Sequence, residues 1–187
     1  MQQGAEEREI PSDPFEEYLV GSAGTFGSGF ESLDDLVGQS DIVAVVEVVD
    51  QRRGPVTAEE HGLRTTQRVL EVVVQDALKG TANGDRIDVW DADIVERADA
   101  VGDGGSLLVT TDGHVLEVGD RVLVGLNSDE REQFLGLYGI QSESAFFVLD
   151  GTGRSFLPID SRSNPAAEVI DAMPLSDVIA SIESVAD

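Results

Sequence analysis

The chain has 187 residues, no cysteine, and 37 acidic against 12 basic side chains, a formal net charge of -25 at pH 7. Without cysteine there can be no disulfide, thiolate nucleophile or cysteine zinc site. The acidic balance disfavours nucleic acid and anionic membrane surfaces as partners, since both attract cationic proteins.

Residues 1–30 predict a flexible acidic leader ahead of a single domain over residues 31–187. The stretch 21–30 is rich in Gly and Ser, which is typical of a linker, and it comes after an acidic start. That start lacks the basic-then-apolar order of a signal peptide, and no run of about 18 apolar residues predicts a membrane span. We expect either a tether or a disordered chain end.

A short helix and a long strand open the expected domain. Ser32 with Asp35 forms a capping-box pattern, and Gly38 is expected to end the helix. The next stretch, "SDIVAVVEVVD", alternates as a strand with one fully apolar face and one interrupted by Glu47.

The segment after this strand decides between two fold classes. A dinucleotide-binding fold would place a Gly-rich phosphate loop and a helix next. The chain has no G-x-G-x-x-G there, and a loop instead leads to a second extended run over residues 65–78. Two long strands without an intervening helix predict an antiparallel pair.

Turn signals then recur along the chain. Asn83-Gly84, Asp112-Gly113 and Asp150-Gly151 each tolerate the positive φ of tight hairpins. Short apolar runs at 120–127 and 132–140 lie between them. The count reaches seven or eight strands, which predicts a mainly β fold, an antiparallel closed or nearly closed barrel.

The tail changes to helical spacing. From Leu175 an apolar stripe recurs through Val178, Ile182 and Val185, and Pro174 suits the first turn. We expect this amphipathic C-terminal helix to cover a barrel opening or an exposed sheet edge.

A resemblance rests on five stretches: "SLDDLVGQSDIVAVVEVVD", "VLEVVVQDALKG", "GDRIDVW", "VGDRVLVGLN" and "GLYGIQSESAFFVLDGTG". Over residues 32–153 the chain resembles a group of uncharacterised prokaryotic extracytoplasmic domains, which is similar to the OB-fold barrels of metalloproteinase-inhibitor and netrin-like proteins. Lys79-Gly80 and Gly119-Asp120 are its most recognisable positions. The resemblance implies an OB-fold-like barrel and an extracytoplasmic location, secreted or envelope-tethered. It implies no inhibitor activity, because those proteins reach a catalytic zinc with an N-terminal cysteine and this chain has no cysteine.

Candidate chemistry is sparse. The chain has no G-x-S-x-G elbow and no P-loop. Its two histidines, His61 and His114, fall in or beside expected turns, where exposed histidines are common, and no H-E-x-x-H pattern links them to a metal.

The acidic stretch 88–105 is the best place to look for a ligand. Five aspartates there offer hard oxygen donors of the kind calcium binds: Asp88, Asp91, Asp93, Asp99 and Asp103. The D-x-[DN]-x-[DN]-G calcium loop is missing, however, and clustering of this kind is expected in so acidic a chain. A solvated loop is the favoured interpretation, with a calcium site as the alternative.

Aromatic residues give a second set of candidates. Trp90 is either a core residue or an anchor for a partner on an open barrel face. Phe134, Tyr138, Phe146 and Phe147 could form a base-stacking platform, but without a cationic groove such a platform lacks its main attraction for nucleic acid. We expect them to fill the barrel.

The sequence therefore predicts no catalytic, cofactor or metal site. The preferred hypothesis is a non-catalytic extracytoplasmic binding or interaction module, with a protein or another unidentified ligand as partner. Two alternatives remain open: a carboxylate hydrolase, with or without calcium, built from the acidic stretch and His114, and a structural subunit of a surface assembly.

Overall fold

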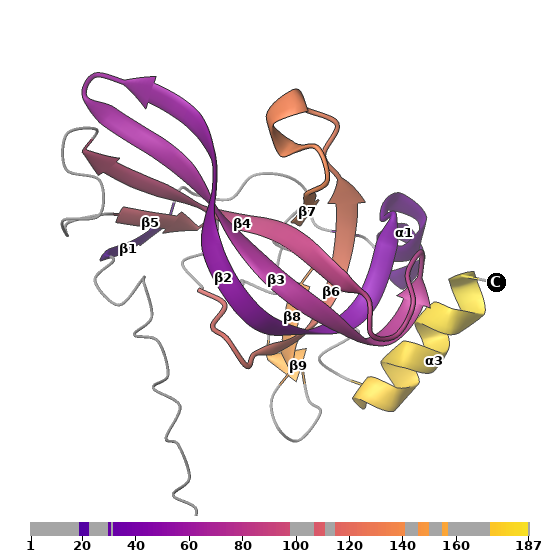
Figure 1. Ribbon diagram of the computed structural model, residues 1–187. Coiled ribbons are helices and arrows are strands. Elements are labelled where there is room, and N and C mark those ends of the chain that lie inside the picture. Colours follow the sequence, from indigo (N-terminus) through magenta and orange to yellow (C-terminus); the bar gives the residue numbers. More distant parts are fainter. Residues whose placement is uncertain are drawn as a thin grey trace, which may run out of the picture.

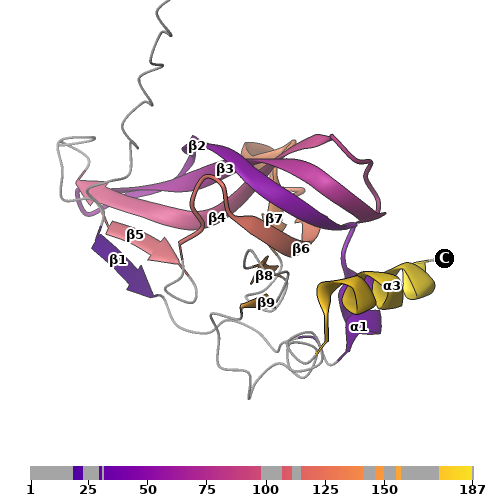
Figure 2. The ribbon, with the colours of Figure 1, turned by 90° about the horizontal axis from the view of Figure 1, so that it is seen from below.

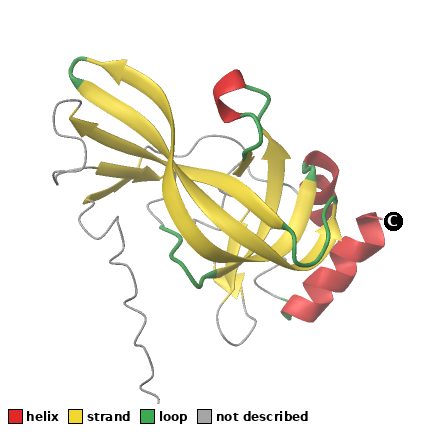
Figure 3. Ribbon diagram, in the orientation of Figure 1, coloured by secondary structure: helices red, strands yellow, loops and turns green. Residues whose placement is uncertain are grey.

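The structure is a computed structural model that describes residues 19–22, 30, 32–97, 107–110, 115–140, 146–149, 155–156 and 173–186 (Figure 1). This part of the chain is mainly β (Figure 3). Its helices are α1 (Leu33–Gln39), the one-turn 3-10 helix η1 (Glu132–Phe134) and α3 (Leu175–Ala186). Its strands are β1 (Leu19–Ser22), β2 (Ile42–Glu60), β3 (Leu63–Lys79), β4 (Arg86–Arg97), β5 (Leu107–Thr110), β6 (Arg121–Ser128), β7 (Tyr138–Ile140), β8 (Phe146–Leu149) and β9 (Ser155–Phe156).

Five strands close a ring. β2 pairs with β3 on one side and with β6 on the other, β3 pairs with β4, and β7 joins β4 to β6. The β4–β7 and β1–β5 pairs are parallel and the others are antiparallel. The sheet is therefore mixed, which corrects the expectation of a wholly antiparallel one.

The two long neighbouring strands do form the expected antiparallel pair, but β2 is longer than predicted. It continues to Glu60 through the stretch expected to be a loop, with register shifts between Arg53 and Ala58. His61 and Gly62 then turn the chain with φ of 53° and 77°, as a two-residue hairpin requires. The far half of this hairpin, residues 54–66, extends away from the ring, and we call it the hairpin arm (Figure 1).

Other boundaries also differ from expectation. Residues 19–22, inside the expected leader, form β1 beside β5. Residues 115–117, which follow the Asp112-Gly113 hairpin signal, are not in a strand. The run 132–140 divides into η1 and β7 around Gly136, whose φ is 87°. The Asn83-Gly84 turn is confirmed, since Gly84 donates to the Val74 carbonyl at 2.8 Å with a φ of 88°. The dipeptides at 112–113 and 150–151 lie outside the described residues.

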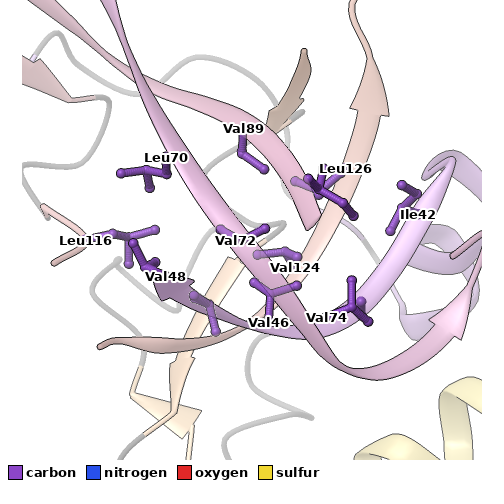
Figure 4. Packing of buried hydrophobic residues seen from close by; sticks show 13 residues of the cluster. Ile42, Val46, Val48, Leu70, Val72, Val74, Val89, Leu116, Val124 and Leu126 are labelled. Atoms are coloured by element: carbon purple, nitrogen blue, oxygen red, sulfur yellow. The ribbon is translucent and has the colours of Figure 1, made fainter. Parts of the chain in front are cut away.

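The first part of β2, residues 42–48, is buried on both faces. The face that carries Ile42, Val46 and Val48 points into the ring, where it packs with side chains from β3, β4 and β6 (Figure 4). That inner cluster consists of Ile42, Ala44, Val46, Val48, Leu70, Val72, Val74, Ile87, Val89, Leu116, Val122, Val124 and Leu126. Alternating side chains explain how one strand supplies a second core on its other face.

The outer face of β2 forms that second core with the helices. Val43 and Val45 pack with Leu123 and Phe147 beneath α1 and α3, which lie together at one end of the molecule (Figure 2). α3 therefore covers a sheet face beside α1, not a ring opening or a sheet edge. Its Val185 is 40 % exposed, so the predicted apolar stripe is buried only through Ile182.

Side chains cap both ends of α1 with hydrogen bonds to its backbone. Ser32 is its N-cap and accepts a 3.1 Å hydrogen bond from the Asp35 backbone N–H, as the capping-box pattern predicted. The helix ends at Gln39, one residue beyond Gly38. Lys79 of β3 donates to the carbonyls of Val37 and Ser40 at 2.6 and 2.7 Å, so it caps the C-terminal end of α1.

In the described residues no helix has the length and the apolar composition needed to cross a bilayer.

The outer core gives a direct test of how α3 is seated. Ile182→Ala removes a side chain with no exposed surface and should lower the free energy of unfolding by about 2–5 kcal/mol. Val185→Ala, one turn later on the same helix, should change it by less than about 0.5 kcal/mol. Urea unfolding measures both; equal losses would contradict this seating of the helix.

Candidate functional site

The acidic stretch expected to be a loop is strand over all of its described length, because β4 continues to Arg97. Asp88 stands opposite Glu71 and Asp93 stands opposite Gln67 on neighbouring β3. Asp91 lies at a register shift between Val69 and Arg68. Because side chains alternate along a strand, the three aspartates have different surroundings.

Asp91 forms a buried ion pair with Arg68. The guanidinium Nε donates to Oδ1 at 2.9 Å and Nη2 bonds Oδ2, while Nη1 donates to the Leu116 carbonyl at 3.1 Å. The Arg68 and Asp91 side chains are only 1 % and 7 % exposed. A bidentate geometry of this kind is what makes a buried pair tolerable. Asp91 is thus committed to the fold.

Asp93 accepts a hydrogen bond from the side-chain amide of Gln67. Burial raises the pKa of Asp93, while the hydrogen bond from Gln67 and the charge of Arg131 act in the opposite direction. Gln67 itself is buried, and its Oε1 has no hydrogen-bond partner within the described chain. A half-buried carboxyl of this kind is a feature of functional sites and of structural pairs alike.

Trp90 lies beside Asp93, and the loop that carries η1 packs against its ring. Its ring centroid is 5.9 Å from that of Phe134, and Val69 and Leu137 complete the cluster. The Arg131 guanidinium lies 4.1 Å from the Phe134 centroid and 5.6 Å from the Trp90 centroid, within the range of cation–π attraction. A Cβ on Gly139 would come within 2.8 Å of the Trp90 ring.

Asp129 holds Arg131 in this position through hydrogen bonds of 2.5–3.1 Å. The hydrogen bond from Arg131 is the main reason that the pKa of Asp129 is lowered, and it raises the pKa of Arg131. The Trp90 indole makes the smallest contribution to lowering the Asp129 pKa, and its Nε1 makes no hydrogen bond of good geometry in the described structure.

These residues form one cluster, which we call the β3–β4 face: Gln67, Trp90, Asp93, Asp129, Arg131 and Phe134. Arg131 is exposed and Trp90 and Asp93 are half-buried, whereas Gln67 and Phe134 are buried beneath them. The hairpin arm borders this face on one side, and the β6–β7 loop contributes Asp129, Arg131 and Phe134 to it (Figure 1). The face presents a half-buried carboxyl and an exposed cation stacked on aromatic rings. Such a set can bind polar and aromatic groups.

The other predicted site residues do not converge on it. His61 is exposed at the tip of the hairpin arm, and Asp88 pairs with Arg52 at 2.5 Å. Phe147 belongs to the outer core under the helices, and Tyr138 packs against the ring core. The expectation that Phe134 and Phe147 fill the ring is therefore wrong, because Phe134 packs on Trp90 and Phe147 packs under the helices. Asp99, Asp103 and His114 lie outside the described residues, as does the side chain of Phe146.

Within the described residues no three carboxylate or histidine side chains come together as a potential metal site. Asp88, Asp91 and Asp93 each have a different partner.

Sequence reasoning missed Gln67, Arg68 and Arg131. Arg68 had a readable signal, because it falls on the same strand face as Leu70 and Val72, where a charge needs a buried partner. Arg131 had none, since its role depends on a loop folding back over Trp90.

Comparisons of the chain with models of protein families and with curated protein sequences give no match.

The buried pair predicts unequal costs for two arginines. Arg68→Met leaves Asp91 without its bidentate partner and should lower the free energy of unfolding by about 3–5 kcal/mol. Arg52→Gln removes an exposed pair and should cost about 1 kcal/mol or less. The double variant Arg68→Met/Asp91→Leu should recover most of the loss. Urea denaturation that shows no recovery would contradict the assignment of the loss to the stranded carboxylate.

Two aspartates should respond to pH with opposite signs. The raised pKa of Asp93 means that the folded state binds its proton more tightly than the unfolded state, so its contribution to stability falls as pH rises above about 3.8 through the folded pKa. The lowered pKa of Asp129 gives a contribution that is present above about 3.8 and lost as pH falls through the folded pKa.

Asp93→Asn should therefore stabilise the protein at pH 7, and Asp129→Asn should destabilise it. Both differences should shrink toward acidic pH, where the wild-type carboxyls are protonated. Thermal unfolding between pH 3 and pH 8 tests this pair of signs, and the same sign for both variants at pH 7 would be incompatible with it.

Proposed function

We propose that the chain is a non-catalytic extracytoplasmic binding or interaction module built on an OB-fold-like barrel. The order in which strands pair around the ring, β2–β3–β4–β7–β6, supports the fold assignment, because an OB-fold is a five-stranded Greek-key barrel. β2 to β4, β6 and β7 then correspond to its five strands in chain order.

The observation that carries the proposed function is the position of the β3–β4 face. OB-folds bind ligands on the face of their second and third strands, between the loop joining strands one and two and the loop joining strands four and five. In this chain those elements are β3 and β4, the hairpin arm and the β6–β7 loop. Trp90 lies on β4, and Arg131 of the β6–β7 loop stacks on its ring.

The chemistry of this surface favours a protein partner. Trp and Arg are enriched among the residues that dominate protein interfaces. Apolar side chains flank the face, since Leu63 at the arm is 47 % exposed and Leu135 beside η1 is 69 % exposed. A net charge of -25 opposes nucleic acid on the same surface.

Two further observations shape the proposal. The carboxylates Asp88 and Asp91 are paired with arginines, which favours binding over catalysis. The extracytoplasmic location is supported by the resemblance over residues 32–153, and fractionation of native cells with an antibody to the chain tests it.

Partner capture tests the surface. The wild-type chain, coupled to beads, should recover a reproducible protein from native envelope or medium, and Leu63→Asp and Leu135→Asp should each reduce recovery at least about tenfold, as a charge placed in an interface predicts. Val118→Asp, at a residue 54 % exposed on the β5–β6 connection, is the matched control. Equal recovery by all four proteins, or no reproducible partner, counts against the proposal. Recovery of further copies of the chain alone would favour the structural-subunit alternative.

Calorimetric titration with calcium separates the module from a calcium-dependent hydrolase. An acidic surface should bind calcium weakly and without a defined stoichiometry, whereas a built site would saturate at one or two ions. Saturation at low stoichiometry would count against the proposal.

A further inference from the structure

The four carboxylates of β4 differ in their partners. Three of them form ion pairs with arginines of β2 and β3: Asp88 with Arg52, Asp91 with Arg68 and Glu96 with Arg53. Asp93 is the fourth. Within the described chain it forms no ion pair, and its one hydrogen bond comes from the neutral side-chain amide of Gln67.

A register shift brings Asp93 to the same face of the sheet as Trp90. Trp90 pairs with Val69 and Asp93 pairs with Gln67, so a step of three residues on β4 matches a step of two on β3. On a regular strand, residues three apart lie on opposite faces, and the bulge removes that difference. Gln67 is buried, and its amide fixes the position of the half-buried Asp93 carboxylate.

Arg131 does not serve as the counter-ion of Asp93. Its guanidinium is hydrogen-bonded to Asp129 and lies over the Phe134 ring, and it acts on Asp93 only as a nearby charge. Burial raises the pKa of Asp93 in spite of that charge, so the ionised carboxylate weakens the folded state at neutral pH. A charge that the fold does not need favours a role in binding.

We propose that Asp93 binds an arginine side chain of the protein partner, which supplies the counter-ion that the fold lacks. This inference rests on the proposed function, because it assigns one contact of the β3–β4 face. A guanidinium suits a half-buried carboxylate, since it is less strongly hydrated than an ammonium group. The other three carboxylates of β4 are paired with guanidinium groups as well.

The surroundings of Asp93 fit such a partner segment. The net charge of -25 attracts a basic partner to this surface. Leu63 lies on the same face of β3, four residues before Gln67, and is 47 % exposed. An apolar neighbour of the partner's arginine would therefore contact the hairpin arm.

The fluorescence of Trp90 tests the contact, because Trp90 is the only tryptophan in the chain and lies beside Asp93. The probes are the capped peptides Leu-Arg-Leu and Leu-citrulline-Leu, which differ in charge and hardly in shape. At about 0.15 M salt, which limits long-range effects of the net charge, the arginine peptide should give a saturable change. The citrulline peptide should bind at least about tenfold more weakly, since it lacks the charge-assisted hydrogen bond. No saturable change with the arginine peptide, or equal binding of both, would overturn the proposal.

Variants locate the contact. Asp93→Asn keeps an acceptor for the Gln67 amide and should reduce the affinity for the arginine peptide to that for the citrulline peptide. Asp76→Asn, at an exposed carboxylate near the other end of β3, removes the same charge and should leave the affinity unchanged. Thermal unfolding confirms that both variants are folded. Undiminished binding of the arginine peptide by Asp93→Asn would refute the placement.

Partner capture separates this inference from the proposed function. Asp93→Asn should reduce recovery of the protein partner at least about tenfold. Recovery that is lost with Leu63→Asp but complete with Asp93→Asn would rule out the arginine contact and leave the proposed function standing. Peptide binding that depends on Asp93, without any recoverable partner, would support cation binding by Asp93 and count against a protein partner.

Discussion

The two-sided burial of β2 is the constraint on which the rest of the structure depends. One face supplies Ile42, Val46 and Val48 to the ring, and the other supplies Val43 and Val45 to the core under the helices. β2 also pairs along both edges near its start, with β3 and β6. Both cores and both neighbouring strands therefore meet at this one segment.

Arginine placement depends on the same architecture. Beyond Val48 the β2–β3 pair leaves the ring. Arg68 lies two residues before Leu70 on β3 and points to the same, inner side. Its charge is balanced by Asp91 and by the Leu116 carbonyl, since a buried guanidinium without such partners would be too costly. At the other end of β3, the Lys79 ammonium group donates hydrogen bonds to the backbone carbonyls at the end of α1. Several of the few cations in this acidic chain are thus committed to the fold.

The motif residues that suggested a family have structural roles in this fold. Gly80 has a φ of 72°, and a Cβ there would clash with the Asp41 carbonyl oxygen. Gly119 donates to the Val48 carbonyl at 2.8 Å, and Asp120 accepts from the Glu117 backbone N–H at 2.8 Å. Such positions define a fold and leave function to the surfaces around it. The surface proposed here for binding is the β3–β4 face.

The sequence by itself determined the features that depend on local patterning: the mainly β composition, the antiparallel β2–β3 pair, the Ser32 cap, the Asn83-Gly84 turn and the apolar face of α3. Alternation, turn chemistry and helical spacing act over a few residues, so a single chain reveals them. Only the tertiary structure decided that β2 and β4 continue through their polar stretches, that β7 pairs in parallel with β4, and that Arg131 stacks on Trp90 and Phe134. Each of these depends on partners distant in sequence, whose packing and charges outweigh local preference.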